Sequence, residues 1–174
     1  MTVAPDDTFE SEDGVAHIAR FGPIFACIFY KGLSAATLDA VREWQGPIMP
    51  AEPIYSFSMS FAADRLAPDV AAAADRLLLQ FRDQTAGSAT VLRVFGFEGS
   101  AARAMLGTIH LVTRAAYPRK VFSNVADGTA WLTKLRGECP HVAAADVWLT
   151  RFEHADNRRR AATGEPQGSD NEFR

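Results

Sequence analysis

Histidine and cysteine are the residue types in this chain best suited to metal binding or to base and nucleophile chemistry. None of them shows the short spacing typical of zinc ligands. A serine nucleophile would need a histidine and an acid brought together in space, and the chain has neither a GxSxG turn nor a Cys-His signature. We therefore predict no catalytic residue, no metal and no cofactor. The residues considered are His17, His110, His141, His154, Cys27 and Cys139.

A glycine-rich turn, "VFGFEGSAAR", is the strongest candidate for an anion site. Gly96, Gly99 and Ser100 would lie where a strand leads into a helix, and backbone N–H groups at a helix N-terminus attract anions. The turn lacks the third glycine of a dinucleotide fingerprint and the lysine of a P-loop. An ordinary strand-to-helix connection is the alternative interpretation.

The stretch "YSFSMSF" alternates hydroxyl and apolar side chains. Ser56, Ser58 and Ser60 fall on one face of the predicted strand, and larger apolar residues fall on the other. Small hydroxyl groups would let another polypeptide or a ligand approach the sheet closely, so these serines are candidate partner-binding residues. The alternative is that this face of the sheet simply meets water, as in a sheet with helices on one side.

Arg93 is a single charge in the apolar stretch "VLRVF". It would form an ion pair with a partner's carboxylate, or else lie at an edge or on the open face with its stem along apolar surface. Trp148 and Phe152 are four residues apart on a predicted helix at 141–156, a spacing typical of aromatic anchors that dock in a groove. That helix would fold back on its own domain, cross to a second copy, or bind a different protein.

Composition limits the classes of partner. The chain has 174 residues, 48% of them hydrophobic, and a formal net charge of −3. This charge gives no basic field for nucleic acid or anionic membranes. The N-terminus lacks the basic and apolar regions of a signal peptide, and the longest apolar run, "PIFACIFY", is far short of a bilayer span. We expect a cytoplasmic protein that neither binds nucleic acid nor inserts into a membrane.

Periodicity predicts an α/β fold in the order β-β-α-β-α-β-α-β-α, with a five-stranded, mixed, mostly parallel sheet and helices mainly on one side. Strands at 15–21 and 24–31 form a hairpin through Gly22 and Pro23. The remaining strands are predicted at 54–61, 89–95 and 119–124. The first helix is predicted to begin after an N-cap at Ser34, and the second at Pro68, with Gly87 just past its end.

A third helix is predicted to begin at a cap Ser100, with Met105, Ile109 and Val112 on one face. A fourth is predicted to begin at a cap Asp127, with Trp131 and Leu135 as an i, i+4 pair.

Four segments are predicted along the chain. Residues 1–13 are acidic and polar and read as a flexible arm. Residues 14–137 form the α/β domain, 138–156 a C-terminal amphipathic helix, and 157–174 a disordered tail.

The element order, the "FGFEGSAARAML" turn and the ending "VFSNVADGTAWL" resemble the STAS family of sulfate transporter and anti-sigma factor antagonist domains, together with SEC14-like small bacterial proteins. The resemblance covers about residues 15–137. It implies a regulatory protein-binding module without chemistry of its own. In anti-sigma antagonists a phosphorylatable serine follows the third strand, whereas here that stretch, "AADRLAPDV", has no Ser or Thr. Asp64 or Asp69 would supply a permanent negative charge there.

We therefore expect a non-enzymatic regulatory or scaffolding module that acts by recognising another protein, with a homodimer compatible with this role. The first alternative is a small-ligand or lipid-binding protein with an apolar cavity lined by Tyr30, Phe57 and Met59. The second is an enzyme of unknown type. An enclosed cavity would favour the ligand-binding alternative, and a filled core with a flat apolar patch would favour protein recognition.

Overall fold

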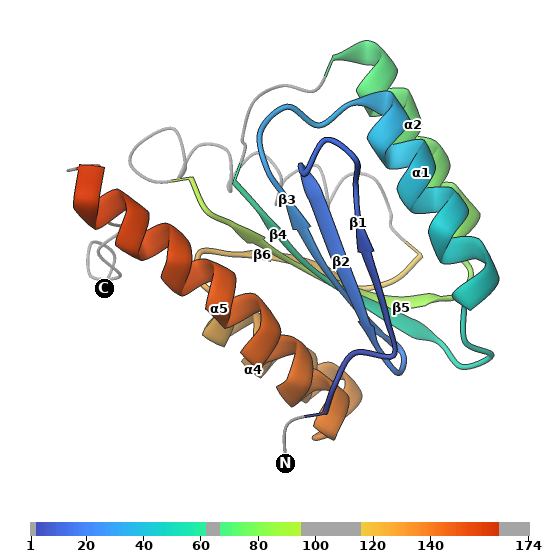
Figure 1. Cartoon of the computed structure of the whole chain (residues 1–174). Helices are drawn as coiled ribbons and strands as arrows, with labels where there is room; N and C mark the ends of the chain where they lie inside the picture. Colours follow the sequence, from blue (N-terminus) through green and yellow to red (C-terminus); the bar gives the residue numbers. More distant parts are fainter. Residues whose placement is uncertain (1–2, 62–66, 95–115, 164–174) are drawn as a thin grey trace.

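A computed structural model describes residues 3–61, 67–94 and 116–163. In these residues one six-stranded sheet, in the order β1-β2-β3-β4-β5-β6, lies between two layers of helices (Figure 1). The strands are β1 (Asp7–Glu10), β2 (Ala16–Phe21), β3 (Ile24–Phe29), β4 (Ile54–Ser60), β5 (Thr85–Leu92) and β6 (Arg119–Phe122). The helices are α1 (Ala35–Gln45), α2 (Pro68–Gln80), α4 (Val125–Arg136) and α5 (Pro140–Thr163), with a 3-10 turn at Gly46–Ile48.

The sheet is mixed. β1 and β3 each pair antiparallel with β2, while β3, β4, β5 and β6 pair in parallel. The predicted hairpin is confirmed: Gly22, with φ of +55°, lies between β2 and β3 in a backbone conformation that glycine adopts at little cost. The prediction of a mixed α/β sheet is therefore confirmed. None of the helices in the described part of the chain combines the length and apolar character needed to cross a bilayer.

The sheet has six strands rather than the predicted five, because β1 forms inside the segment expected to be a flexible arm. The Asp7 carboxylate accepts hydrogen bonds from Arg20 Nε at 2.8 Å and Nη2 at 2.6 Å across the β1–β2 pair. Phe9 packs its ring 5.5 Å from that of Trp44. Cross-strand pairs of this kind stabilise a short edge strand. The acidic composition of residues 1–13 favoured a flexible arm and gave no sign of these contacts.

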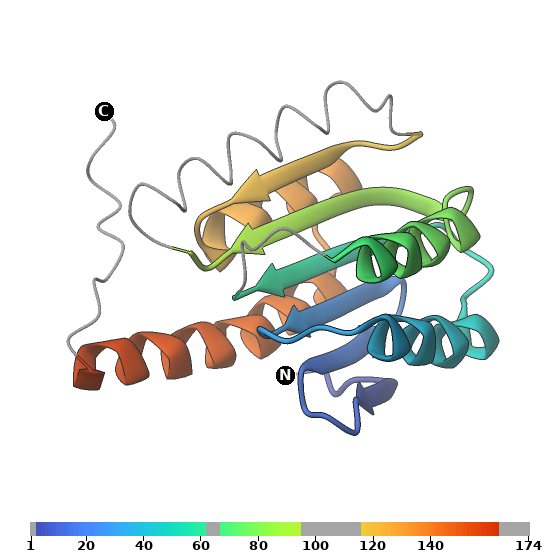
Figure 2. The same ribbon diagram turned by 90° about the horizontal axis from the view of Figure 1, so that it is seen from above.

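The helices cover both faces of the sheet, which corrects the expectation of helices mainly on one side. Figure 2 shows α1 and α2 on one face and α4 and α5 on the other. Helices α1 and α2 lie in crossovers between parallel strands that advance in one direction, so right-handed connections place them on the same face. Helices α4 and α5 come after β6 in the chain and do not connect two parallel strands. The handedness rule for crossovers therefore does not apply to them, and they cover the opposite face.

Several element boundaries differ from the sequence prediction; β5, for example, covers Thr85–Leu92 and not 89–95. Gly87 lies within β5 and not past the end of α2; a Cβ there would lie 2.5 Å from a Leu135 methyl carbon, so glycine admits α4 close to the sheet. The cap of α4 is Asn124, whose side chain accepts from the N–H of Asp127 at 2.8 Å. Helix α5 continues to Thr163, beyond the predicted 156, because Asp156 forms ion pairs one turn ahead with Arg159 and Arg160. Ser34 caps α1 and Pro68 opens α2, as predicted.

The main hydrophobic core lies between the sheet and the α4–α5 layer. The side chains of Phe57 and Met59 from β4 are fully buried there, as are Leu132 of α4 and Leu149 of α5. Gly128 lets α4 approach closely, since a Cβ at this position would lie 2.7 Å from the Phe57 ring. The apolar half of the β4 alternation is therefore entirely used by the core.

We expect Gly128→Ala to lower the free energy of unfolding by about 1–3 kcal/mol, because the added methyl overlaps the Phe57 ring in a packed core. Urea denaturation measures this change. The sign is diagnostic: glycine to alanine inside a helix otherwise stabilises by about 1 kcal/mol. A more stable variant would show that α4 does not press on Phe57. Ala130→Gly, at an exposed position of the same helix, is the control for helix propensity alone.

Candidate functional site

The predicted serine row lies on the face of the sheet that α1 and α2 cover. Ser56, Ser58 and Ser60 are each half-buried. The interpretation that this face of the sheet simply meets water is therefore wrong, although the serines are not sealed in a core either. The structure brings Ser56 and Ser58 into a cavity with hydroxyl residues of the next strand, while Ser60 does not line it. The alternation itself is confirmed, because Phe57 and Met59 point to the opposite face.

The floor of this cavity carries hydroxyl groups from two adjacent strands. Ser56 pairs in register with Ser88, and Ser58 with Thr90. The Ser58 and Thr90 hydroxyls lie 3.1 Å apart in a hydrogen bond. Among the described residues, no side-chain hydrogen bond occupies the hydroxyls of Ser56 or Ser88, so both keep donor and acceptor capacity toward the cavity.

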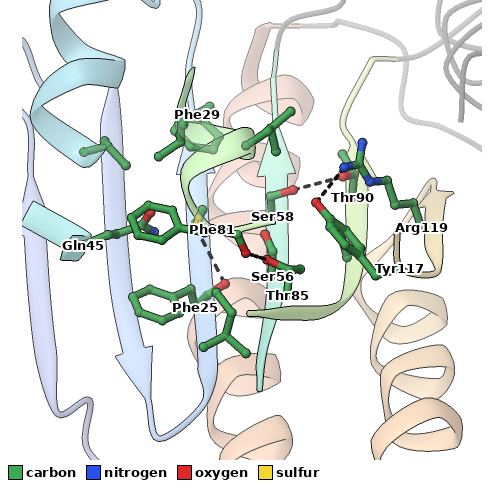
Figure 3. A pocket seen from close by; sticks show the side chains of 16 residues that line it. Phe25, Phe29, Gln45, Ser56, Ser58, Phe81, Thr85, Thr90, Tyr117 and Arg119 are labelled. Carbon is green, nitrogen blue, oxygen red and sulfur yellow. Dashed lines mark hydrogen bonds between the residues drawn. The ribbon is translucent and has the colours of Figure 1, made fainter. Parts of the chain in front are cut away.

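The cavity between this floor and the two helices has a volume of about 250 Å³, and we call it the hydroxyl cavity (Figure 3). Its walls are aromatic and aliphatic, with one thiol, one amide and one guanidinium among them. Its lining comes from α1, α2, β3, β4, β5 and the residues around the start of β6. The lining residues are Phe25, Cys27, Phe29, Val41, Gln45, Ile54, Ser56, Ser58, Leu77, Leu78, Phe81, Thr85, Ser88, Thr90, Tyr117 and Arg119.

Contacts between α1 and α2 hold the roof of the hydroxyl cavity together. Arg76 of α2 donates to the Asp39 carboxylate of α1 at 2.8 Å. The hydrogen bond from Arg76, aided by the positive charges of Arg76 and Arg42, lowers the pKa of Asp39 below its usual value. Arg42 also donates to Gln80 Oε1 at 3.3 Å, near the ends of both helices. These exposed contacts fix the relative position of two helices over a floor of small side chains.

Arg119 is the one charged side chain among the described residues that line the cavity. Its Nη2 donates to the Tyr117 hydroxyl at 2.7 Å, and its guanidinium carbon lies 4.4 Å from the centre of the Tyr117 ring. The Arg119 Nε is buried and has no hydrogen-bond acceptor. In the described part of the chain no carboxylate forms an ion pair with this guanidinium. A positive charge with unused donors therefore borders the cavity.

The cavity lining contains no side chain ready for acid–base chemistry among the residues described. It includes no histidine, aspartate, glutamate or lysine. Burial raises the pKa of the Cys27 thiol to about 12, so the sulfur stays protonated and is a poor nucleophile near neutral pH. Across residues 3–61, 67–94 and 116–163, no three histidine, cysteine or acidic side chains are grouped as metal ligands.

Arg93 is buried in an ion-pair cluster within the chain, which corrects its predicted edge or open-face position. Only 5% of the residue is exposed. Its guanidinium lies 3.0 Å from Glu153 and 3.8 Å from Asp156 of α5, and donates to Asn157 Oδ1. The other interpretation was an ion pair with a partner's carboxylate, whereas the carboxylates found beside Arg93 belong to the same molecule.

Trp148 and Phe152 pack against the protein's own sheet, the first of the three arrangements considered for their helix. Their ring centres are 4.9 Å apart, and Phe152 lies 6.0 Å from His17 of β2. Both join the core on the α4–α5 face as partly buried members. The 141–156 segment is thus part of the domain layer and not a detached element.

Other predicted site residues fall outside the cavity. Tyr30, Phe57 and Met59, expected to line an apolar pocket, pack in or against the core on the opposite face. Gly96, Gly99 and Ser100, the predicted anion site, lie outside the described residues, as do Asp64, His110 and the helix predicted after Ser100. Asp69 lies in the first turn of α2.

Sequence reasoning missed the partners of the serine row. Ser88 and Thr90 repeat the alternation of β4 on the neighbouring strand, with Arg119 following on β6. The pattern "SAT" at 88–90 was the available signal, and it gains meaning only once the pairing of β4 with β5 is known.

Comparisons with models of protein families, with curated proteins and with solved structures found no match. The resemblance to the STAS family therefore stays a prediction, and the function is argued from the geometry alone.

We expect Arg93→Ala to lower the free energy of unfolding by about 3–5 kcal/mol, because it removes a buried guanidinium that pairs with the largely buried Glu153 carboxylate. Thermal or urea denaturation measures the loss. Arg158→Ala removes an exposed arginine from α5 and should change stability by less than about 0.5 kcal/mol. Equal effects of the two substitutions would show that the buried cluster contributes no more than a surface charge.

We expect Cys27 to resist alkylation in the folded protein. With a pKa raised to about 12, its thiolate fraction at pH 8 is on the order of one in ten thousand, and it rises about tenfold with each pH unit below the pKa. Iodoacetamide labelling followed by peptide mass spectrometry should show Cys27 reacting on the order of a thousandfold more slowly in the folded protein than in urea. Comparable rates in both states would contradict the burial of this thiol.

Proposed function

We propose that this protein is a non-enzymatic binding domain whose ligand is a compact, partly apolar small molecule held in the hydroxyl cavity. The observation that carries the proposal is a space of about 250 Å³ with aromatic and aliphatic walls and a floor of hydroxyl groups. Small-molecule sites commonly occupy ~300–1,000 Å³, and an apolar cavity of ~150 Å³ already holds benzene. A single ring or a short chain with one polar group therefore suits the volume.

The lining supports binding without chemistry. A serine hydroxyl becomes a nucleophile only when a base removes its proton, and the described lining offers no histidine or carboxylate to do so. The Cys27 thiol stays neutral for the reason given above. Hydroxyl groups with unused hydrogen-bonding capacity instead orient a ligand, while the phenylalanine rings supply apolar contact area.

This proposal replaces protein recognition as the favoured role. The expected recognition residues Trp148 and Phe152 contribute to the core, and Arg93 pairs with carboxylates of its own chain. Ser56 and Ser58 line an internal space between helices and sheet. The residues that suggested a protein partner therefore either stabilise the fold or face the hydroxyl cavity.

We expect benzamide to bind in the hydroxyl cavity and Ser56→Phe to weaken this binding at least tenfold, because the new ring occupies the floor. A probe of about nine non-hydrogen atoms at ~0.5 kcal/mol per atom reaches roughly millimolar affinity. Chemical-shift changes in protein NMR spectra measure this range.

Ala126→Phe is the matched control, because it adds the same ring at an exposed position of α4 on the opposite face. It should leave benzamide affinity unchanged. Equal affinity of the wild type and Ser56→Phe for benzamide would overturn the proposed function. Preserved dispersion of the NMR spectra confirms that each variant is folded.

A further inference from the structure

We propose that the ligand of the hydroxyl cavity is a compact apolar carboxylate whose negative charge pairs with Arg119. This inference rests on the proposed function and adds the chemical class of the ligand. It follows from the charge, the free donors and the alignment of the residues that border the cavity.

The first argument is the state of the Arg119 side chain. A guanidinium carries five N–H donors, and among the described residues the only recorded acceptor is the Tyr117 hydroxyl. The Nε donor is buried without any acceptor. In the described part of the chain the Nε atoms of Arg42 and Arg136 also lack an acceptor, so the argument depends on the position of the Arg119 guanidinium at the border of the cavity. A ligand carboxylate would supply both the acceptor oxygens and the opposite charge.

The second argument is that Tyr117 holds the guanidinium in place before any ligand arrives. The hydroxyl accepts from Arg119 Nη2 at 2.7 Å, while the ring lies 4.4 Å from the guanidinium carbon. In Figure 3 the two side chains lie together at one end of the cavity, away from Phe25 and Gln45. An arginine whose position is already fixed loses less conformational entropy on binding, so more of the ion-pair energy appears as affinity.

The third argument is a polarity gradient across the sheet. The strand register places Phe25, Ser56, Ser88 and Arg119 side by side on β3, β4, β5 and β6. Adjacent strands are ~4.8 Å apart, so Ser56 and Arg119 are separated by roughly 10 Å along this row. One end of the row is an aromatic ring, the middle is two hydroxyls, and the other end is a cation. A ligand with an apolar body and one anionic end matches this order.

A single negative charge fits better than a phosphate. Arg119 is the one charged group in the described lining, so a carboxylate is neutralised one to one. A phosphate monoester carries ~−1.5 to −2 at neutral pH and would leave part of its charge uncompensated inside an apolar cavity. The hydroxyls of Ser56 and Ser88 can donate to a carboxylate oxygen or to a neutral carbonyl oxygen. The preference for a carboxylate over a neutral ligand therefore comes from Arg119.

The test compares benzoate with benzamide, which has nearly the same shape and no charge. We expect wild-type protein to bind benzoate at neutral pH roughly tenfold to a hundredfold more tightly than benzamide, as a charge-assisted hydrogen bond gives over a neutral one. Arg119→Met should bring benzoate affinity down to the benzamide level and leave benzamide affinity within about twofold. Arg119→Lys keeps the positive charge but loses the planar guanidinium. Its affinity for benzoate should lie between those of the wild type and Arg119→Met.

Lys120→Met is the control, because Lys120 is the neighbouring cation on β6 and its Nζ lies over the Phe122 ring on the opposite face of the sheet. It should leave the ratio of the two affinities unchanged. Equal binding of benzoate and benzamide to the wild type would overturn the carboxylate inference and leave the proposed function standing. Failure of both probes to bind would overturn both. A preference for benzoate that survives Arg119→Met but is lost in Lys120→Met would place the anion elsewhere and also overturn the inference.

Discussion

The pleat of β4 is the constraint on which the rest of the molecule depends. Because successive side chains of a strand point to opposite faces, one seven-residue segment delivers Phe57 and Met59 to the core under α4 and α5 and Ser56 and Ser58 to the other face. A shift of one residue in its pairing with β3 and β5 would turn the three hydroxyls into the core under α4 and α5 and the apolar residues toward α1 and α2. The register is therefore strongly fixed, and with it the different character of the two faces.

The two helix layers serve different purposes because of this division. On the α4–α5 face the large side chains of Phe57, Met59 and Leu149 form a packed core, and Gly128 permits close approach of α4. The ion pairs of Arg93 with Glu153 and Asp156 hold α5 against the strand ends. On the α1–α2 face the floor is built from serine and threonine, which are too small to reach the helices above them. The cavity is the space that these small side chains leave.

The sequence predicted those parts of the structure that depend on local pattern. The β2–β3 hairpin, the β4 alternation, the Ser34 cap and the start of α2 at Pro68 are all set by neighbouring residues, and all are confirmed. The number of helix layers was wrong because the placement of α4 and α5 depends on packing over long sequence distances. Strand β1 was missed because its acidic residues are paired with Arg20, which the composition of an arm does not reveal.

The candidate site was predictable in one strand and not beyond it. The serine row was recognised, but its meaning depends on Ser88, Thr90 and Arg119, which lie about 30 to 60 residues away in sequence and are neighbours only through strand pairing. Arg93 shows the same limit: a carboxylate of a partner was one of two interpretations of this charge, and its pairing with Glu153 and Asp156 is visible only in the fold. Side chains that require a partner can be found in a sequence, whereas the partner itself requires the fold.

The central claim is that the space beneath α1 and α2 is an accessible ligand site. Intermolecular nuclear Overhauser effects between benzamide ring protons and methyl groups of the protein test it most directly. The account predicts contacts with the methyl groups of Leu77, Val41 and Thr90, which line the hydroxyl cavity from roof and floor. Contacts confined to the exposed methyl groups of Leu135 and Val147, which belong to the opposite helix layer, would contradict it.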